Sequence, residues 1–286
     1  MTLRMRHAVV LAVFCVPCLA PHFAHAETPV EQAWSVLYTG LADGNVPKRT
    51  TAVQVLGLLP DDAKAREAAL KALKDDKPEV RAAAAKSLGD MKAKSAANEL
   101  VTMFQDSDVG VILAAAGALV ELGDNRGYEV YYAVLTGERK GGQSLMAEQK
   151  KMLNDPKKMA QFGFEQGISF IPYAGLGYGV FKMATKDTTS PVLAAAALKL
   201  VNDKDPKSGE AIASAAQDNK SWVVRAAALN ALALRGQTSL LPAAESGLQD
   251  DKEEVRYSAA AAVIRLTDLS RRPALKAAAK PAPKKK

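Results

Sequence analysis

Cysteine and histidine are scarce in this 286-residue sequence, and they lie at one end of it. All five of them precede residue 27: His7, Cys15, Cys18, His22 and His25. Residues 27–286 therefore lack the side chains for a thiol nucleophile, a disulfide, a Cys/His zinc site or an imidazole-dependent hydrolytic triad. These absences predict a protein that is not an enzyme and has no metal or cofactor. A lyase-like enzyme, the least favoured alternative, would have to use carboxylate, lysine or tyrosine chemistry.

The apolar run near the N-terminus is too short to span a bilayer. It covers the 12 residues Ala8–Leu19, whereas a spanning helix needs roughly 20. Two arginines precede the run, and Ala24-His25-Ala26 follows it in the small-x-small pattern that signal peptidase cleaves. Residues 1–26 are therefore expected to be a signal peptide, and the protein to be exported to the periplasm or the extracellular space. An uncleaved signal anchor is the alternative.

Acidic residues are missing from the C-terminal segment, residues 271–286. This segment holds seven basic residues, and residues 1–26 add two more, out of a formal net charge of +7. Residues 27–270 are left with a net charge of −2, so no nucleic-acid partner is expected despite the basic pI. Alternating Pro, Ala and Lys cannot bury apolar area, which predicts a disordered tail. Its lysines could attract an anionic envelope surface: Lys280, Lys284, Lys285 and Lys286.

A repeated frame, Asp-x-x-x-x-Val-Arg-x-x-Ala, fills much of the remaining chain. It is clearest at Asp75–Ala84 and Asp250–Ala259, and arginine recurs at positions 49, 81, 225 and 256. Two degenerate units place Ile112 and Leu193 where arginine would stand. The successive steps are then 32, 31, 81, 32 and 31 residues, so one gap is about 50 residues too long.

Each unit predicts a pair of short amphipathic helices joined by a polar turn. The turn aspartate lies near an N-cap position, Pro78 is compatible with a first helical turn, and Gly89 and Gly123 are expected to end helices. Two short helices cannot bury a core alone, so neighbouring pairs must stack. The sequence predicts an all-α fold, an α-solenoid of five to six helical hairpins with a mid-array insertion.

This pattern resembles HEAT repeats, in particular the short bacterial kind shared with phycobilisome-lyase-type proteins. The resemblance covers roughly residues 30–136 and 187–269. It implies a structural ladder that links adjacent repeats through the turn aspartates and helix arginines: Arg49, Asp75, Arg81, Arg225, Asp250 and Arg256. It also implies a scaffold, adaptor or recognition role, in which a protein partner is bound.

The resulting domain organisation has five segments: 1–26, signal peptide; 27–136, N-terminal repeats; 137–186, insertion; 187–270, C-terminal repeats; and 271–286, basic tail. Within the insertion, residues 162–184 hold six of the fourteen Phe and Tyr residues and only two charges. Three interpretations stay open for them: an extra helical pair that packs internally, a partner-binding surface, or contact with lipid.

The leading function hypothesis is a non-catalytic protein-interaction scaffold. The candidate partner-binding aromatic residues are Phe170, Tyr173, Tyr178, Phe181, Trp222 and Tyr257. Packing between the last two repeats is the competing interpretation for Trp222 and Tyr257. An envelope-associated protein that binds anionic lipid or cell-wall polymer through residues 162–184 and the basic tail is the alternative function.

Overall fold

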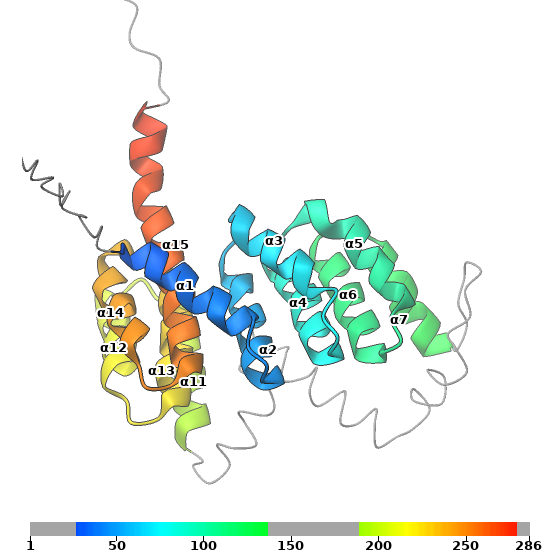
Figure 1. Cartoon of the computed structure of the whole chain (residues 1–286). Coiled ribbons are helices and arrows are strands. Elements are labelled where there is room, and N and C mark those ends of the chain that lie inside the picture. The colour runs from blue at the N-terminus through cyan, green and yellow to red at the C-terminus, as the bar shows by residue number, and fades with distance from the viewer. Residues whose placement is uncertain (1–26, 137–188, 279–286) are drawn as a thin grey trace, which may run out of the picture.

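The computed structural model describes residues 27–136 and 189–278, and all regular structure in them is helical (Figure 1). The N-terminal half contains α1 (Pro29–Leu41), α2 (Val46–Val55), α3 (Ala63–Ala72), α4 (Pro78–Asp90), α5 (Ala97–Thr102), α6 (Val109–Glu121) and α7 (Arg126–Thr136). The C-terminal half contains α11 (Thr189–Lys199), α12 (Pro206–Asp218), α13 (Trp222–Arg235), α14 (Leu241–Ser246) and α15 (Glu253–Ala278). Short 3-10 turns extend several of these helices.

Local sequence explains most helix boundaries. The α1 helix begins with a capping box, in which Thr28 and Glu31 satisfy each other's backbone N–H groups. Prolines occupy the first turn of α1, α2, α4, α12 and α14, where an N–H would have no helical partner. Gly123 has a φ of +78°, which suits a residue that follows a helix end. Gly89 does not end its helix as predicted, because α4 continues to Asp90.

Five consecutive pairs form helical hairpins: α1/α2, α3/α4, α5/α6, α12/α13 and α14/α15. Single helices, α7 and α11, flank the segment 137–188, which lies outside the described residues together with the predicted insertion. The predicted all-α solenoid of helical hairpins is confirmed.

The order of the hairpins in space differs from their order in the sequence. Helix α11 packs on α13, and α13 packs on α15. The last helix, α15, then packs on α1 and α2, and the stack continues through α4 and α6 to α7. Figure 1 shows α1 and α15 side by side, although they come from opposite ends of the described chain. The first repeat thus follows the last one, and α7 and α11 lie at the two ends of the stack that residues 27–136 and 189–278 form.

One hydrophobic core runs through this stack from α11 to α6, and a second, smaller one packs α7 on α6. The larger core includes Ala197 of α11, Leu232 of α13, Leu266 of α15, Leu37 of α1 and Leu119 of α6. Many helix positions that face a neighbouring helix are alanine, which allows close approach of the backbones. Because the core does not stop between the two halves, they form one packed unit.

The C-terminal end of the fold differs from the prediction. Helix α15 continues to Ala278, so the predicted start of a disordered tail at residue 271 is wrong for residues 271–278. Arg272 explains part of this extension, since its guanidinium bonds Asp268 one turn earlier at 2.7 Å. The tail lysines from Lys280 onward and the predicted signal peptide lie outside the described residues. Within the part of the chain that the structure describes, no helix has the length and apolar character needed to cross a membrane.

Candidate functional site

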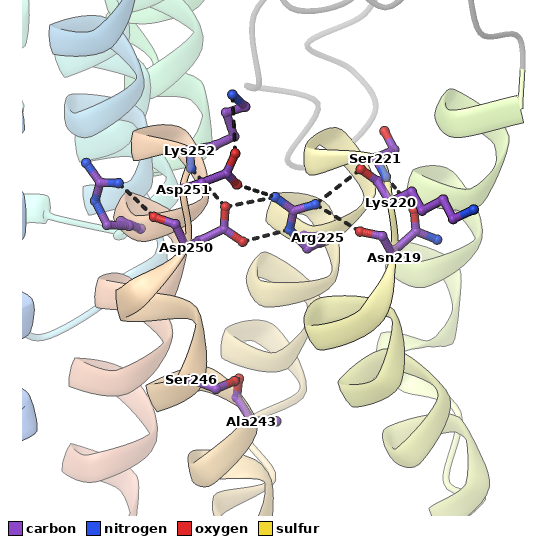
Figure 2. Close-up of polar contacts among 10 residues, drawn as sticks. Asn219, Lys220, Ser221, Arg225, Ala243, Ser246, Asp250, Asp251 and Lys252 are labelled. Atoms are coloured by element: carbon purple, nitrogen blue, oxygen red, sulfur yellow. Dashed lines mark hydrogen bonds and ion pairs between the residues drawn. The ribbon is translucent and has the colours of Figure 1, made fainter.

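Bidentate arginine–aspartate pairs link consecutive hairpins, and we call each pair a rung. The three rungs are Arg49–Asp75, Arg81–Asp106 and Arg225–Asp250. In each one, the arginine Nε and Nη2 donate to the two carboxylate oxygens at 2.7–3.0 Å. The third nitrogen, Nη1, donates to a main-chain oxygen in the turn of the arginine's own hairpin, such as Asn219 O at 2.9 Å (Figure 2). Each arginine therefore joins two successive turns.

The rung aspartates also fix their own turns. The carboxylate of Asp250 accepts the N–H of Lys252 at 2.9 Å, and Asp75 and Asp106 accept the corresponding N–H groups (Figure 2). The hydrogen bond from Arg49 is the main cause that lowers the pKa of Asp75. Burial alone would raise the pKa of Asp106 and Asp250, but their arginine and backbone hydrogen bonds together lower it. The rung carboxylates therefore stay charged at neutral pH.

The step from α15 to the α1/α2 hairpin, which we call the junction, has no rung within the described residues. Arg256 keeps the bond from Nη1 to Asp250 O at 2.7 Å. Its Nη2, however, contacts Glu253 at 3.3 Å on its own helix, and not Asp43 in the next turn of the stack. Lys48 of α2 reaches back to Glu253 at 2.5 Å. In this ion pair the cation comes from the following hairpin, the reverse of a rung. Arg265 of α15 also crosses the junction, and its Nη1 donates to Leu58 O, just after α2, at 2.6 Å.

Tyr257 fills the junction from the α15 side. Its side chain is buried, with 3% exposure, and burial raises its pKa to about 12. The ring lies against Gly40 of α1, where an added Cβ would stand 2.5 Å from a Tyr257 ring carbon and 2.9 Å from Ala52 Cβ. The prediction that Tyr257 binds a partner is therefore wrong: it packs inside the protein, against Gly40 of the first repeat.

An open groove runs along α1, on the outer side of the stack. We call it the α1 groove; its lining residues are Val30, Glu31, Trp34, Ser35, Tyr38, Thr39 and Lys64. The rings of Trp34 and Tyr38 stack with centroids 5.4 Å apart, and Lys64 Nζ of α3 lies 5.6 Å from the Trp34 ring centroid. Trp34 is buried, with 6% exposure, whereas Tyr38 is 49% exposed. The groove therefore has an aromatic floor and one accessible aromatic ring.

The polar border of the groove is fixed by the start of α1. The Glu31 carboxylate accepts hydrogen bonds from the backbone N–H and the hydroxyl of Thr28, both at 2.8 Å. These bonds are the main cause that lowers the pKa of Glu31, with a smaller effect from the charge of Lys64. One end of the groove thus carries a carboxylate and the α3 side carries an ammonium group.

The sequence matches the family model for HEAT repeats over residues 35–129, 179–265 and 209–283. This chain belongs to the HEAT-repeat family. HEAT repeats generally mediate protein–protein interaction as scaffolds. The matched residues lie in both halves of the stack. They include the degenerate repeats, in which Ile112 and Leu193 replace the ladder arginine.

Two solved structures share limited similarity with this HEAT-repeat chain. Human deoxyhypusine hydroxylase in complex with glycerol is 15% identical, with 83% of this chain and 85% of that chain covered and a TM-score of 0.30. An engineered protein is 17% identical, with 83% and 97% covered and a TM-score of 0.29. No curated protein sequence matches.

The remaining predicted partner-binding residues fall in two groups. Trp222 is partly buried and packs against the core of the HEAT-repeat stack, which fits the packing interpretation. The other four lie outside the described residues: Phe170, Tyr173, Tyr178 and Phe181. Other exposed aromatic residues in the described part lie on α7: Tyr128, Tyr131 and Tyr132. Of these, Tyr131 donates to Leu113 O at 3.3 Å, and burial raises its pKa.

Sequence reasoning missed the α1 groove. Trp34 and Tyr38 are four residues apart and so share one helix face, which was a usable signal. The third member, Lys64, lies in the next hairpin and could be added only from the structure. Within residues 27–136 and 189–278, no group of three or more His, Cys, Asp or Glu side chains is arranged to hold a metal ion.

Proposed function

We propose that this protein is an exported, non-catalytic HEAT-repeat scaffold that binds a protein partner through the α1 groove. The observation that carries the proposal is the half-exposed Tyr38 ring, stacked on a buried tryptophan in an open groove of the outer surface. Aromatic side chains of this kind supply most of the binding free energy at protein interfaces. The stacking fixes the ring before a partner arrives, which lowers the entropy cost of binding.

The position of the first helix supports the export part of the proposal. The capping box begins at Thr28, two residues after the predicted cleavage site at Ala26. Cleavage there would leave α1, its cap and the groove intact. The processed protein would also contain neither cysteine nor histidine, which supports a binding role over catalysis. Mass spectrometry of the protein from a bacterial envelope fraction should find Glu27 as the first residue, and an intact Met1 would contradict export with cleavage.

The binding role can be tested in cells with a photo-crosslinking amino acid at position 35, an exposed serine that lines the α1 groove, so that Tyr38 is kept. We expect one discrete protein adduct from this position. The matched control carries the same amino acid at Glu210, an exposed position of α12 in the other half of the stack. No adduct at position 35, or the same adducts at both positions, would contradict the groove as the binding site.

A further inference from the structure

The outer face of α3, beside the α1 groove, carries an unbalanced positive charge. Helix α3 contains Lys64, Arg66, Lys71 and only one acidic residue, Glu67, which gives a net charge of +2. The first helices of the other described hairpins, α1, α5, α12 and α14, each have a net charge of −1, and α7 has a net charge of zero. Among these described helices, α3 is therefore the one with a net positive charge.

Three lysines lie in a stripe that begins at the groove. Lys64, Lys71 and Lys74 are exposed, and their spacings of seven and three residues place them on one side of α3 and its C-terminal turn. Exposed Glu67 lies on the same side between Lys64 and Lys71, so the stripe carries three positive charges and one negative charge. Lys64 lies over the Trp34 ring. Within the described residues, neither Lys71 nor Lys74 pairs with a carboxylate, whereas Lys48 and Lys86 do. The stripe thus leaves two ammonium groups available to a partner.

We propose that the partner of the α1 groove is an acidic protein segment: an apolar or aromatic anchor enters the groove beside Tyr38, and carboxylates that follow it pair with Lys71 and Lys74. This inference rests on the proposed partner-binding function and names its chemical class. The two features are adjacent, since Lys64 belongs to both. A stripe about 15 Å long, at 1.5 Å per helical residue, matches a short peptide segment. Complementary charges of this kind increase the association rate and select the partner.

The test uses a fluorescein-labelled peptide with a Trp-Leu anchor followed by four glutamates, titrated with the chain that starts at Glu27. The matched probe replaces the four glutamates with glutamines. We expect the acidic peptide to bind about tenfold more tightly in low salt, and the difference to shrink near 0.5 M salt, where the Debye length is only about 4 Å. Equal binding of the two peptides would overturn the proposal.

Charge-reversal variants locate the effect. The double variant Lys71→Glu, Lys74→Glu should weaken acidic-peptide binding at least about tenfold. The control variant Lys204→Glu, Lys207→Glu makes the same charge change at exposed positions beside α12 and should bind like the original chain. Equal losses in both variants would overturn the proposal. So would vesicles of phosphatidylglycerol that bind through Lys71 and Lys74 while the acidic peptide does not, since the stripe would then recognise lipid.

The proposal that the α1 groove binds a protein and the proposal that this protein is acidic can be rejected independently. Photo-crosslinking at position 35 in the Lys71→Glu, Lys74→Glu background tells them apart. An undiminished protein adduct would preserve the groove as a binding site and reject the acidic partner. Loss of the adduct in this background, but not in the Lys204→Glu, Lys207→Glu control, supports both proposals.

Discussion

The steps of the stack that have a rung and the junction solve the same packing problem in different ways. In a step with a rung, both side chains of the bidentate pair are 8–15% exposed. The junction has Tyr257 against Gly40, a hydrogen bond from Arg265 to Leu58 O, and the ion pair Lys48–Glu253, whose side chains are 36% and 34% exposed. Rungs thus link hairpins that are adjacent in sequence, whereas the first repeat packs on the last through a tyrosine–glycine contact and polar contacts of another kind.

The largest difference is expected from breaking a rung. Arg81→Gln leaves the nearly buried Asp106 carboxylate without its bidentate partner, at an expected cost of about 3 kcal/mol of unfolding free energy. Urea unfolding followed by circular dichroism measures this loss. The matched junction variant, Arg256→Gln, removes no rung and should shift the urea midpoint much less. Equal shifts in the two variants would remove the distinction between rungs and junction.

Filling the glycine contact tests the junction itself. Gly40→Ala places a methyl group 2.5 Å from the Tyr257 ring, and overpacking of this kind should cost about 2 kcal/mol. Gly44→Ala is the control, because an added Cβ there has no atom within 4 Å. We expect thermal unfolding to show a clear decrease for Gly40→Ala and a negligible one for Gly44→Ala. Similar results for both would mean that Tyr257 does not hold the junction closed.

Acid should weaken the rungs in preference to the junction. The rung carboxylates have lowered pKa values in the folded state, so their contribution is complete above the unfolded value near 4 and is lost as pH falls through the folded value. Asp90 acts in the opposite direction, because burial raises its pKa. Asp106→Asn should therefore flatten the decrease in stability below pH ~4. An unchanged slope in urea unfolding at several pH values would contradict the assignment.

The smallest effect is expected from the exposed ion pair. In a double-mutant cycle of Lys48→Gln and Glu253→Gln, the coupling should be small and should disappear at high salt, as for other surface ion pairs. The same cycle on Arg81 and Asp106 is the comparison. A junction coupling as large as that of the rung would show that charge, and not packing, closes the stack.

The repeat unit could be recognised in the sequence, but the order of the repeats in space could not. The repeated frame around Arg49, Arg81 and Arg225 predicted helices and turns, and the resemblance to HEAT repeats implied the rungs. Each rung joins residues only 25–26 positions apart. The same frame placed Arg256 in the predicted ladder, although it forms no rung within the described residues. This was not predictable, because a local pattern does not show which hairpin follows the last one. Contacts over about 200 residues, such as Arg265 with Leu58 O at 2.6 Å, have no periodic signal.

Candidate site residues were harder to predict for a related reason. Tyr257 was a candidate partner-binding residue, yet its ring complements Gly40 in a distant helix, and no local pattern marks such a pair. The α1 groove depends on α1 and α3 lying beside each other, so its members stand out only after folding. Residues 271–278 were assigned to a tail from their composition, although the helix of the last repeat continues through them.

The most direct test of the account is a crosslink across the junction. Residues 27–286 contain no cysteine, so Lys48→Cys and Glu253→Cys introduce two unique thiols at side chains that lie in contact. With a short bis-maleimide, this variant should crosslink within a monomer in high yield, whereas Lys48→Cys with Glu210→Cys should not. Absence of the Lys48–Glu253 crosslink, or its formation only between chains, would contradict a single stack in which the first repeat packs on the last.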